Sequence, residues 1–230
     1  MTEAGKAFPQ DAASQLQDMV PTAMEVLTDP KTFFTSMPKA GGYEAPGTFA
    51  VVTLIAYGVL FALLSLLRFH VGGLVASLIL MPVFGVIGLL IGAAVVLFVS
   101  RALGGEAGFE SSFRIVSYSS AIAPIQAAAH AIPYLHILVS AYGFYLLIVA
   151  VIAVHRVPEQ KAWRVLGGIA AVLLVLSFLA TLSARTMRSK IEAMKPKLDE
   201  LSHQMQKQAE EMQKAAEKMQ QEMPRQQQSR

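Results

Sequence analysis

The sequence predicts an all-α membrane protein, a polytopic transmembrane helix bundle followed by a C-terminal amphipathic helix. Three observations support this fold class. Five apolar stretches separated by short polar breaks fill residues 49–184. Hydrophobic residues make up 54% of the chain and the mean hydropathy is +0.48, whereas soluble domains contain roughly 45–50% apolar residues. Beyond residue 184, apolar residues recur at alternating steps of four and three, a pattern typical of an amphipathic helix.

We expect three regions: a polar N-terminal arm with short interfacial helices (1–48), a transmembrane domain (49–184) and a heptad-patterned helical tail that frays at its end (185–230). The arm lacks the basic and apolar segments of a cleavable signal peptide, so we expect the first span to direct insertion. The net charge of +3 comes largely from residues that flank membrane segments and from the tail. This placement favours lipid headgroups over nucleic acid as the partner.

The N-terminal arm contains two short helix signals between its prolines. Thr22 and Glu25 have the spacing of a capping box, which predicts a helix that begins there. Asp29 followed by Pro30 is typical of the N-cap and first position of a second helix. The second helix carries large apolar side chains that either lie in the headgroup zone or pack on loops of the membrane domain: Phe33, Phe34 and Met37.

Four of the five apolar stretches have the length of a transmembrane helix, about 20 residues at ~1.5 Å each. They carry little or no internal charge and cover residues 49–67, 74–100, 137–154 and 165–183. The third stretch, residues 115–132, is the weakest because it contains several polar side chains and a central proline. We expect it to cross as well, which gives five spans. The alternative is four spans and a re-entrant third segment.

The number of lysines and arginines near the span ends helps to choose between five and four spans, because the cytoplasmic ends of spans carry an excess of these residues. With five spans, the two sides of the membrane hold nearly equal numbers of these residues. With four spans, a C-terminal basic cluster joins the N-terminal side and the bias becomes clear. That cluster consists of Arg185, Arg188, Lys190, Lys195 and Lys197.

The polar residues of the third stretch form a candidate membrane site. Ser117, Ser120 and Pro124 fall on one side at helical spacing, and Gln126 is close by. Hydroxyls, amides and prolines are costly in hydrocarbon and usually face the bundle interior or a wet cavity. These residues therefore either form hydrogen bonds to neighbouring helices or line a polar path or a small cavity.

The second stretch places small residues on one helical face, namely Gly85, Gly88 and Gly92. Glycines at this spacing let two helix backbones approach closely, and Gly88 with Gly92 forms a Gly-x-x-x-Gly pair. We expect packing inside the bundle rather than dimerisation of the whole protein.

The C-terminal tail carries a heptad seam that weakens towards its end. The apolar seam residues are Met187, Ile191, Met194, Leu198, Leu201, Met205, Met212 and Met219. Pro196 lies within the pattern and is expected to kink or restart the helix. Three interpretations of the tail stay open: a self-associating coiled coil, an interfacial amphipathic helix, or a solvated single helix.

The sequence gives no support for catalysis, a metal site or a bound cofactor. The predicted spans contain no Asp, Glu, Lys or Arg, the chain has no cysteine, and no glycine-rich phosphate loop is present. We expect Glu106 and Glu110 to be solvated loop carboxylates, and His155 has no partner in the pattern. Three other histidines fall near one membrane face if there are five spans, where they could bind a metal, but nothing in the sequence fixes their mutual distance and we expect ordinary interfacial histidines: His70, His130 and His136.

Two groups of residues at the membrane edges follow a familiar order. The first is Asp29-Pro30-Lys31-Thr32-Phe33-Phe34 with Met37-Pro38 and Gly41-Gly42. The second is Leu103-Gly104-Gly105-Glu106-Ala107-Gly108-Phe109 with Phe113 and Tyr118-Ser119-Ser120. Over residues 29–184 the chain resembles the Yip1 domain family of multi-pass membrane proteins. The resemblance implies a five-span bundle with a cytoplasmic N-terminus and, in eukaryotic members, a role in vesicle trafficking with binding to Rab GTPases.

The sequence thus favours a non-enzymatic membrane scaffold or trafficking-type protein that organises protein or lipid partners and self-associates through its C-terminal helix. The alternative function is a small transporter or channel that uses the polar third stretch. The short N-terminal arm and the added C-terminal helix depart from the eukaryotic layout, so GTPase binding is not expected. We expect a prokaryotic cytoplasmic membrane, or the Golgi or endoplasmic reticulum if the protein is eukaryotic.

Overall fold

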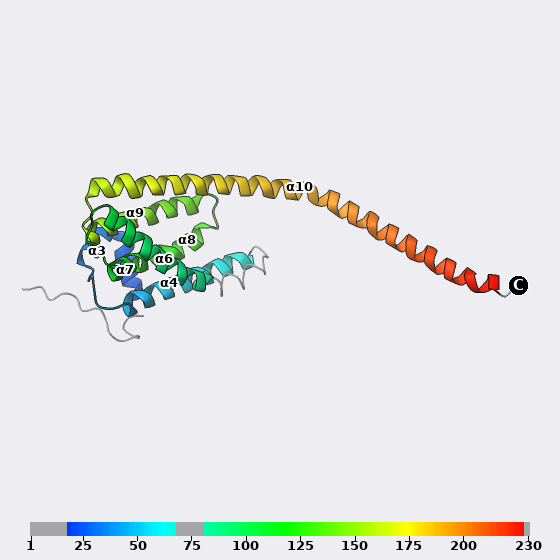
Figure 1. The fold of residues 1–230 in the computed structure, drawn as a ribbon, viewed down its shortest axis with the longest axis horizontal. Coiled ribbons are helices and arrows are strands. Elements are labelled where there is room, and N and C mark those ends of the chain that lie inside the picture. Colours follow the sequence, from blue (N-terminus) through cyan, green and yellow to red (C-terminus); the bar gives the residue numbers. More distant parts are fainter. Residues whose placement is uncertain (1–17, 68–80, 228–230) are drawn as a thin grey trace, which may run out of the picture. The chain divides into compact units, whose positions relative to one another are not determined.

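The computed structural model describes residues 18–67 and 81–227, and within these ranges all regular structure is helical. The chain separates into two units, Met1–Phe178 and Leu179–Arg230. The described helices, shown in Figure 1, are α2 (Met19–Thr28), α3 (Pro30–Ser36), α4 (Glu44–Leu67), α6 (Met81–Ala102), α7 (Phe109–Ser119), the short 3-10 helix η2 (Ser120–Ile122), α8 (Ala123–Ala129), α9 (Leu135–His155) and α10 (Glu159–Gln227). The predicted all-α class is confirmed.

Four helices in the described part of the chain are long and apolar enough to cross a membrane: α4, α6, α9 and the first part of α10. They match four of the five predicted stretches. Their outward side chains are apolar, and Phe98 on α6 is 80% exposed. Exposed apolar area of this extent is stable only against lipid. The protein is therefore an integral, multi-pass membrane protein that sits in a lipid bilayer.

The third stretch folds as three consecutive helical segments, α7, η2 and α8, and no one of them has the length of a span. The interruption follows from Pro124, whose ring clashes with the carbonyl of Ser120 in a regular α-helix. The Ser120 carbonyl instead accepts a hydrogen bond from the Ala123 amide, which closes the turn of η2. The segments pack against α4, α6 and α9, so the polar stretch is enclosed by the apolar helices.

The N-terminal helices differ in part from the prediction. Helix α2 begins at Met19, and the Thr22 amide donates to the Asp18 carbonyl at 2.9 Å, so the predicted capping box at Thr22 is wrong. Pro21 is tolerated because first-turn amides have no partner inside the helix. The second start is confirmed, since Asp29 caps α3 by accepting from the Thr32 amide at 3.3 Å.

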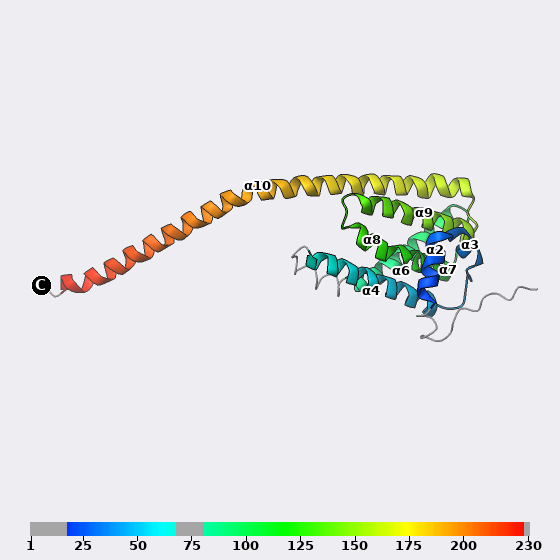
Figure 2. The ribbon, with the colours of Figure 1, turned by 180° about the vertical axis from the view of Figure 1, so that it is seen from behind.

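Helix α3 packs into the bundle. Phe33, Phe34 and Met37 are buried, and the Phe33 ring meets Tyr118 of α7 edge-on at a centroid distance of 5.2 Å. Figure 2 shows α2 and α3 beside α7. Of the two interpretations open from sequence, packing on the domain's own segments describes these three side chains.

The beginning of α10 lies beside α9 in both ribbon views (Figures 1 and 2). Ala162 and Ala170 are its buried positions. Two aromatic contacts also hold this part of α10: Trp163 lies 6.3 Å from Tyr145, and Phe178 lies 5.8 Å from Tyr134, measured between ring centroids. Two small residues and two ring contacts thus line the side of α10 that meets the first unit, while most of its apolar side chains are exposed.

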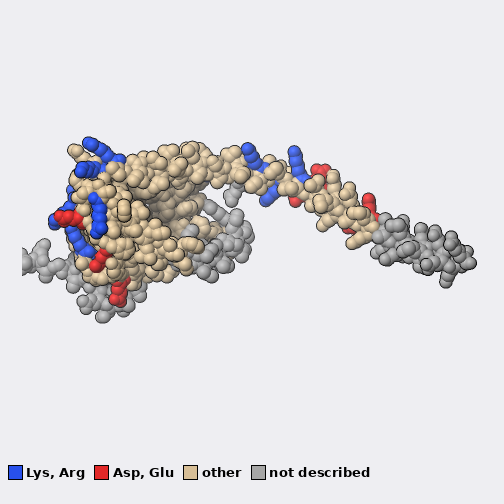
Figure 3. Space-filling view, in the orientation of Figure 1, with Lys and Arg blue, Asp and Glu red and all other residues tan. Residues whose placement is uncertain are grey.

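Charged side chains of the first unit gather at one end of the face seen in Figure 3, near α3 and the connections that follow α6 and α9. The remaining body on that face is uncharged. This division is expected of a helix bundle in which one set of connections meets the headgroups and the helices meet hydrocarbon.

The second unit is the distal part of α10. The helix is continuous through Pro196 up to Gln227, so it does not restart at the proline as the sequence had suggested it could.

Candidate functional site

A cavity of about 680 Å³, largely open on one side, lies in the first unit between α4, α6, the third stretch and α9. Its wall is mostly apolar, with side chains such as Leu54, Phe84 and Phe144. Its polar lining residues are Tyr57, Ser119, Ser120, Gln126 and Ser140. Cavities of this size with an apolar wall and a few polar groups are typical of small-molecule sites.

Ser120 joins the third stretch to α4. Its hydroxyl donates to the Ser117 carbonyl at 2.6 Å and lies 2.6 Å from the hydroxyl of Thr53. Thr53 in turn lies 2.9 Å from the Ala50 carbonyl. This chain of hydroxyls satisfies polar groups that hydrocarbon could not, which is the expected use of serine and threonine in a membrane bundle.

Gln126 joins α8 to α9. Its amide nitrogen donates to the His136 carbonyl at 3.1 Å and to the Ser140 hydroxyl at 3.0 Å. The His130 ring contacts the Gln126 carbonyl at 2.7 Å and stacks on the His136 ring at a centroid distance of 5.1 Å. The polar third stretch therefore acts largely as a set of ties between helices, as one of the two interpretations from sequence stated.

Two hydroxyls of this region have no hydrogen-bond partner in the described part of the chain, those of Ser117 and Ser119. Both oxygens are buried. Only Ser119 lines the cavity, while Ser117 is fully buried in α7. Pro124 shapes the turn before α8 and is absent from the lining. Of the predicted site residues, the cavity thus brings together Ser120 and Gln126.

The three glycines of α6 have different surroundings. A Cβ at Gly85 would lie 2.9 Å from Leu54 of α4, and one at Gly92 would lie 3.3 Å from Val116 of α7. Both are positions of close helix approach. A Cβ at Gly88 would meet nothing within 4 Å, because Gly88 borders the cavity. On the predicted packing face, Gly85 and Gly92 therefore allow close helix contact, whereas Gly88 leaves space for the cavity.

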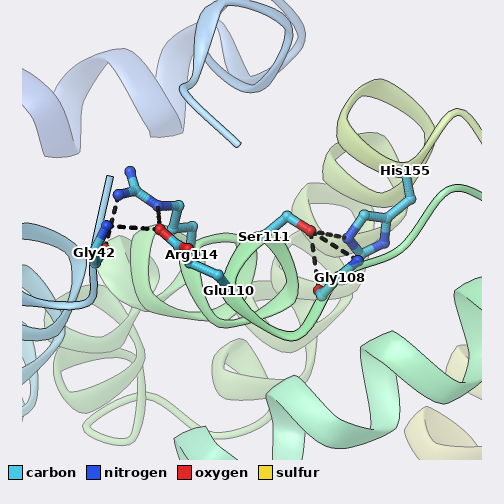
Figure 4. A network of polar contacts seen from close by, with 6 residues as sticks. All are labelled: Gly42, Gly108, Glu110, Ser111, Arg114 and His155. Carbon is cyan, nitrogen blue, oxygen red and sulfur yellow. Dashed lines mark hydrogen bonds and ion pairs between the residues drawn. The ribbon is translucent and has the colours of Figure 1, made fainter. Parts of the chain in front are cut away.

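A second polar arrangement lies at the charged end and holds the loop before α4 (Figure 4). The Gly42 amide donates to the Glu110 carboxylate at 2.7 Å, and the Arg114 guanidinium donates to the Gly42 carbonyl at 2.8 Å. Arg114 and Glu110 are also an ion pair at 3.4 Å, and the arginine side chain is only 3% exposed. Glu110 is thus a binding partner of the loop, and its prediction as a solvated carboxylate is wrong.

His155 is fully buried at the end of α9 and is hydrogen-bonded on both ring nitrogens. Its Nδ1 lies 2.8 Å from the Ser100 hydroxyl, and its Nε2 lies 3.1 Å from Ser111 and 3.4 Å from Ser112. The sequence pattern offered no partner for His155, and the structure gives it three serines. Its partners lie 43–55 residues away in sequence, so no local pattern could have shown them. The cluster ties the ends of α6, α7 and α9 together.

The loop that follows α6 is packed tightly against this cluster. The Gly105 amide donates to the Ser100 carbonyl and the Glu106 amide to the His155 carbonyl, both at 2.8 Å. A Cβ at Gly105 would lie 2.6 Å from Val157 and 2.9 Å from the His155 carbonyl oxygen. Only glycine fits there. Glu106 itself is exposed and makes an exposed ion pair with Arg156 at 3.4 Å.

The tail seam in the second unit is exposed. Its seven residues with described side chains are between 49% and 69% accessible. They are Met187, Ile191, Met194, Leu198, Leu201, Met205 and Met212. The side chain of Met219 lies outside the described residues. The described part of the tail thus presents an exposed apolar stripe, which Gln208 interrupts between Met205 and Met212.

Within the described ranges, no three His, Cys, Asp or Glu side chains lie close enough together to bind one metal ion. His70, one of the three histidines considered from sequence, lies outside the described residues. His130 and His136 stack face to face, an arrangement that packs the rings instead of directing their nitrogens to one point.

Comparison with known proteins agrees with the motifs that form the two loops described above, before α4 and after α6. A family model, the Yip1 domain, matches residues 24–182. No curated protein and no solved structure gives a significant match. The matched segment includes both the loop held by Glu110 and Arg114 and the loop around Gly105. Since it also covers more than half of the chain, the protein belongs to the Yip1 domain family.

Proposed function

We propose that this protein is a non-enzymatic membrane scaffold whose tail helix associates with the same helix of a second copy. The exposed seam of α10 carries the proposal. Seven large apolar side chains in heptad register, each about half exposed or more, are costly in water unless another surface covers them. A second copy is the occupant that presents a matching stripe of the same length.

Two copies in one bilayer with the same orientation would send their tails from the same membrane face, so the paired helices would run parallel. In that register Lys190 would face Lys195 of the other copy across the flank of the seam. This repulsion weakens the membrane-proximal end. The apolar contacts at Ile191, Leu198 and Leu201 must offset it, which predicts a reversible association.

We also propose that the protein is not an enzyme. The burial of His155, which is hydrogen-bonded to serine hydroxyls, supports this part of the proposal. His155 and Ser112 are fully buried, and Ser111 is nearly so. A nucleophile and its base must reach a substrate, whereas this cluster is enclosed by three helix ends. Transport is not part of the proposal, because no described residue of the cavity lining is charged and the Gln126 side chain is hydrogen-bonded within the bundle.

Cysteine cross-linking in membranes tests the association directly, because the chain contains no native cysteine. Leu198→Cys places a thiol on the seam, and His203→Cys places one on the opposite side of the same helix. Cα atoms must come within about 4.4–6.8 Å to form a disulfide. We expect mild oxidation to convert most of the Leu198→Cys protein into a covalent dimer and to leave His203→Cys monomeric.

The His203→Cys variant controls for random collisions, because both variants share the same membrane, expression level and exposed position. Equal cross-linking of the two variants, or none at Leu198→Cys, would contradict the proposal. The second result would favour an interfacial or a solvated helix.

A further inference from the structure

We propose that the bundle cavity binds one uncharged lipid that carries a hydrogen-bonding group, such as a fatty alcohol or a diacylglycerol. The ligand would come from the surrounding bilayer. This inference goes beyond the scaffold function and does not depend on the tail, since every lining residue belongs to the first unit.

The chemistry of the wall selects against charge. None of the lining residues within 18–67 and 81–227 is Asp, Glu, Lys, Arg or His. An ion moved from water into such a wall would lose its hydration without a compensating partner. The apolar side chains of Leu54, Val116 and Phe144 instead suit a hydrocarbon chain. An apolar body with one neutral polar group is the ligand that fits both parts of the lining.

The cavity opens towards the same surface that meets lipid. Phe84 lines it and is also 63% exposed, between Val83 and Ile87, which are about half exposed on α6. A molecule dissolved in the bilayer therefore has a direct path into the cavity. A water-soluble ligand would first have to cross hydrocarbon to reach it.

One wall group is left without a hydrogen bond. The buried Ser119 hydroxyl has no partner in the described part of the chain, and Ser119 lines the cavity. The oxygen itself is closed off from the cavity in this structure, so the Ser119 side chain must turn about its Cα–Cβ bond to present it. A buried polar group that stays unpaired is costly, so pairing it with a ligand hydroxyl or carbonyl in this way gains a specific interaction. Gln126, also in the wall, uses its amide nitrogen within the bundle.

Gly88 keeps the cavity open. Since a Cβ there meets nothing within 4 Å, Gly88→Leu would place a large side chain into the cavity without a clash at its first atom. Gly168 on α10 offers a matched control. It is exposed, its added Cβ also meets nothing within 4 Å, and it is absent from the lining.

The first experiment uses the full chain in lipid nanodiscs that contain a long-chain fatty alcohol with a photoactivatable diazirine. Mass spectrometry locates the cross-linked residues. We expect labelling of cavity residues on α6, α8 and α9, reduced about tenfold or more by Gly88→Leu, the loss that filling a site of this kind produces. Gly168→Leu should label like the wild type. Equal labelling in the two variants, or labelling confined to outward side chains, would overturn the proposal.

A second pair of variants separates binding from folding. Ser119→Ala and Ser117→Ala each remove a buried, unpartnered hydroxyl from α7, but only Ser119 lines the cavity. Unlabelled fatty alcohol should compete for labelling about tenfold better than the alkane of the same length, which neither donates nor accepts a hydrogen bond, in the wild type and in Ser117→Ala, as expected for one hydrogen bond to a buried hydroxyl. Ser119→Ala should lose this preference. A preference retained in Ser119→Ala, or absent from the wild type, would refute the role of the hydroxyl.

Discussion

Gly105 lies in the loop after α6 and packs against the end of α9. Its amide bonds to the Ser100 carbonyl, and its missing side chain leaves room for Val157 and the His155 carbonyl. Backbone atoms cannot move aside as the end of a flexible side chain can. The glycine is therefore required by packing, and it lies within a segment that resembles the Yip1 domain family.

We expect Gly105→Ala to destabilise the folded bundle by about 1–3 kcal/mol, the usual cost of forcing a methyl group into a packed site. Thermal unfolding of the purified protein in detergent measures the change. Gly168→Ala is the control, since its Cβ meets no neighbour and alanine favours a helix. Unfolding temperatures that fall equally in both variants would show that contacts at Gly105 are not the cause.

At the scale of elements, the third stretch shows what the sequence could and could not reveal. Its hydroxyls and amide indicated an enclosed segment, and Ser120 and Gln126 do tie α4 and α9 to it. The division into α7, η2 and α8 follows from Pro124. The sequence did not show that Arg114 holds the loop before α4, because its partner Gly42 lies 72 residues away in the chain.

The loop before α4 is held by the buried Arg114 and by Glu110, so we expect Arg114→Met to release it. The loop then loses the hydrogen bond from the Arg114 guanidinium to the Gly42 carbonyl, and Glu110, whose side chain is 28% exposed, loses its opposite charge. Limited trypsin digestion should then cut after Lys39, an exposed residue in this loop, at least about tenfold faster.

Arg156→Met is the matched control for the loop. Its ion pair with Glu106 is 69% and 71% exposed, and exposed pairs contribute little to stability. The cut after Lys39 should therefore occur at the wild-type rate in this variant. A wild-type rate in Arg114→Met would mean that the aromatic contacts of Tyr43 hold the loop without the arginine.

At the scale of the whole molecule, long apolar runs predicted the membrane class and four spanning helices. Helices α4 and α9 end within two residues of the expected stretches, because uninterrupted apolar sequence fixes a span by length alone. Contacts between distant segments, such as Phe33 against Tyr118, depend on how the helices associate. Periodicity along one segment carries no information about them.

The order of the helices predicts that the two ends of the chain lie on opposite sides of the membrane. Segments α7, η2 and α8 follow one another from the charged end of the first unit, and α9 returns to it in Figure 1. Lys39→Cys and Glu200→Cys place thiols at exposed positions near the two ends. A membrane-impermeant maleimide should label only one of them in sealed vesicles and both after permeabilisation.

Labelling of both thiols from one side would instead mean an even number of crossings. The third stretch would then be re-entrant, and the basic residues of the tail would share a side with those near α3. Lysis of the same vesicles provides the control for thiol reactivity, because each variant then serves as its own reference.

The position of Trp163 against Tyr145 gives the molecule a built-in optical probe. It is the only tryptophan of the chain, and it is 41% exposed near the start of α10. Its fluorescence therefore arises from a single place, where α10 meets α9, and brominated lipids of known depth would quench it according to its level in the bilayer. The docking of this helix can thus be followed in the unaltered protein, with no dye attached.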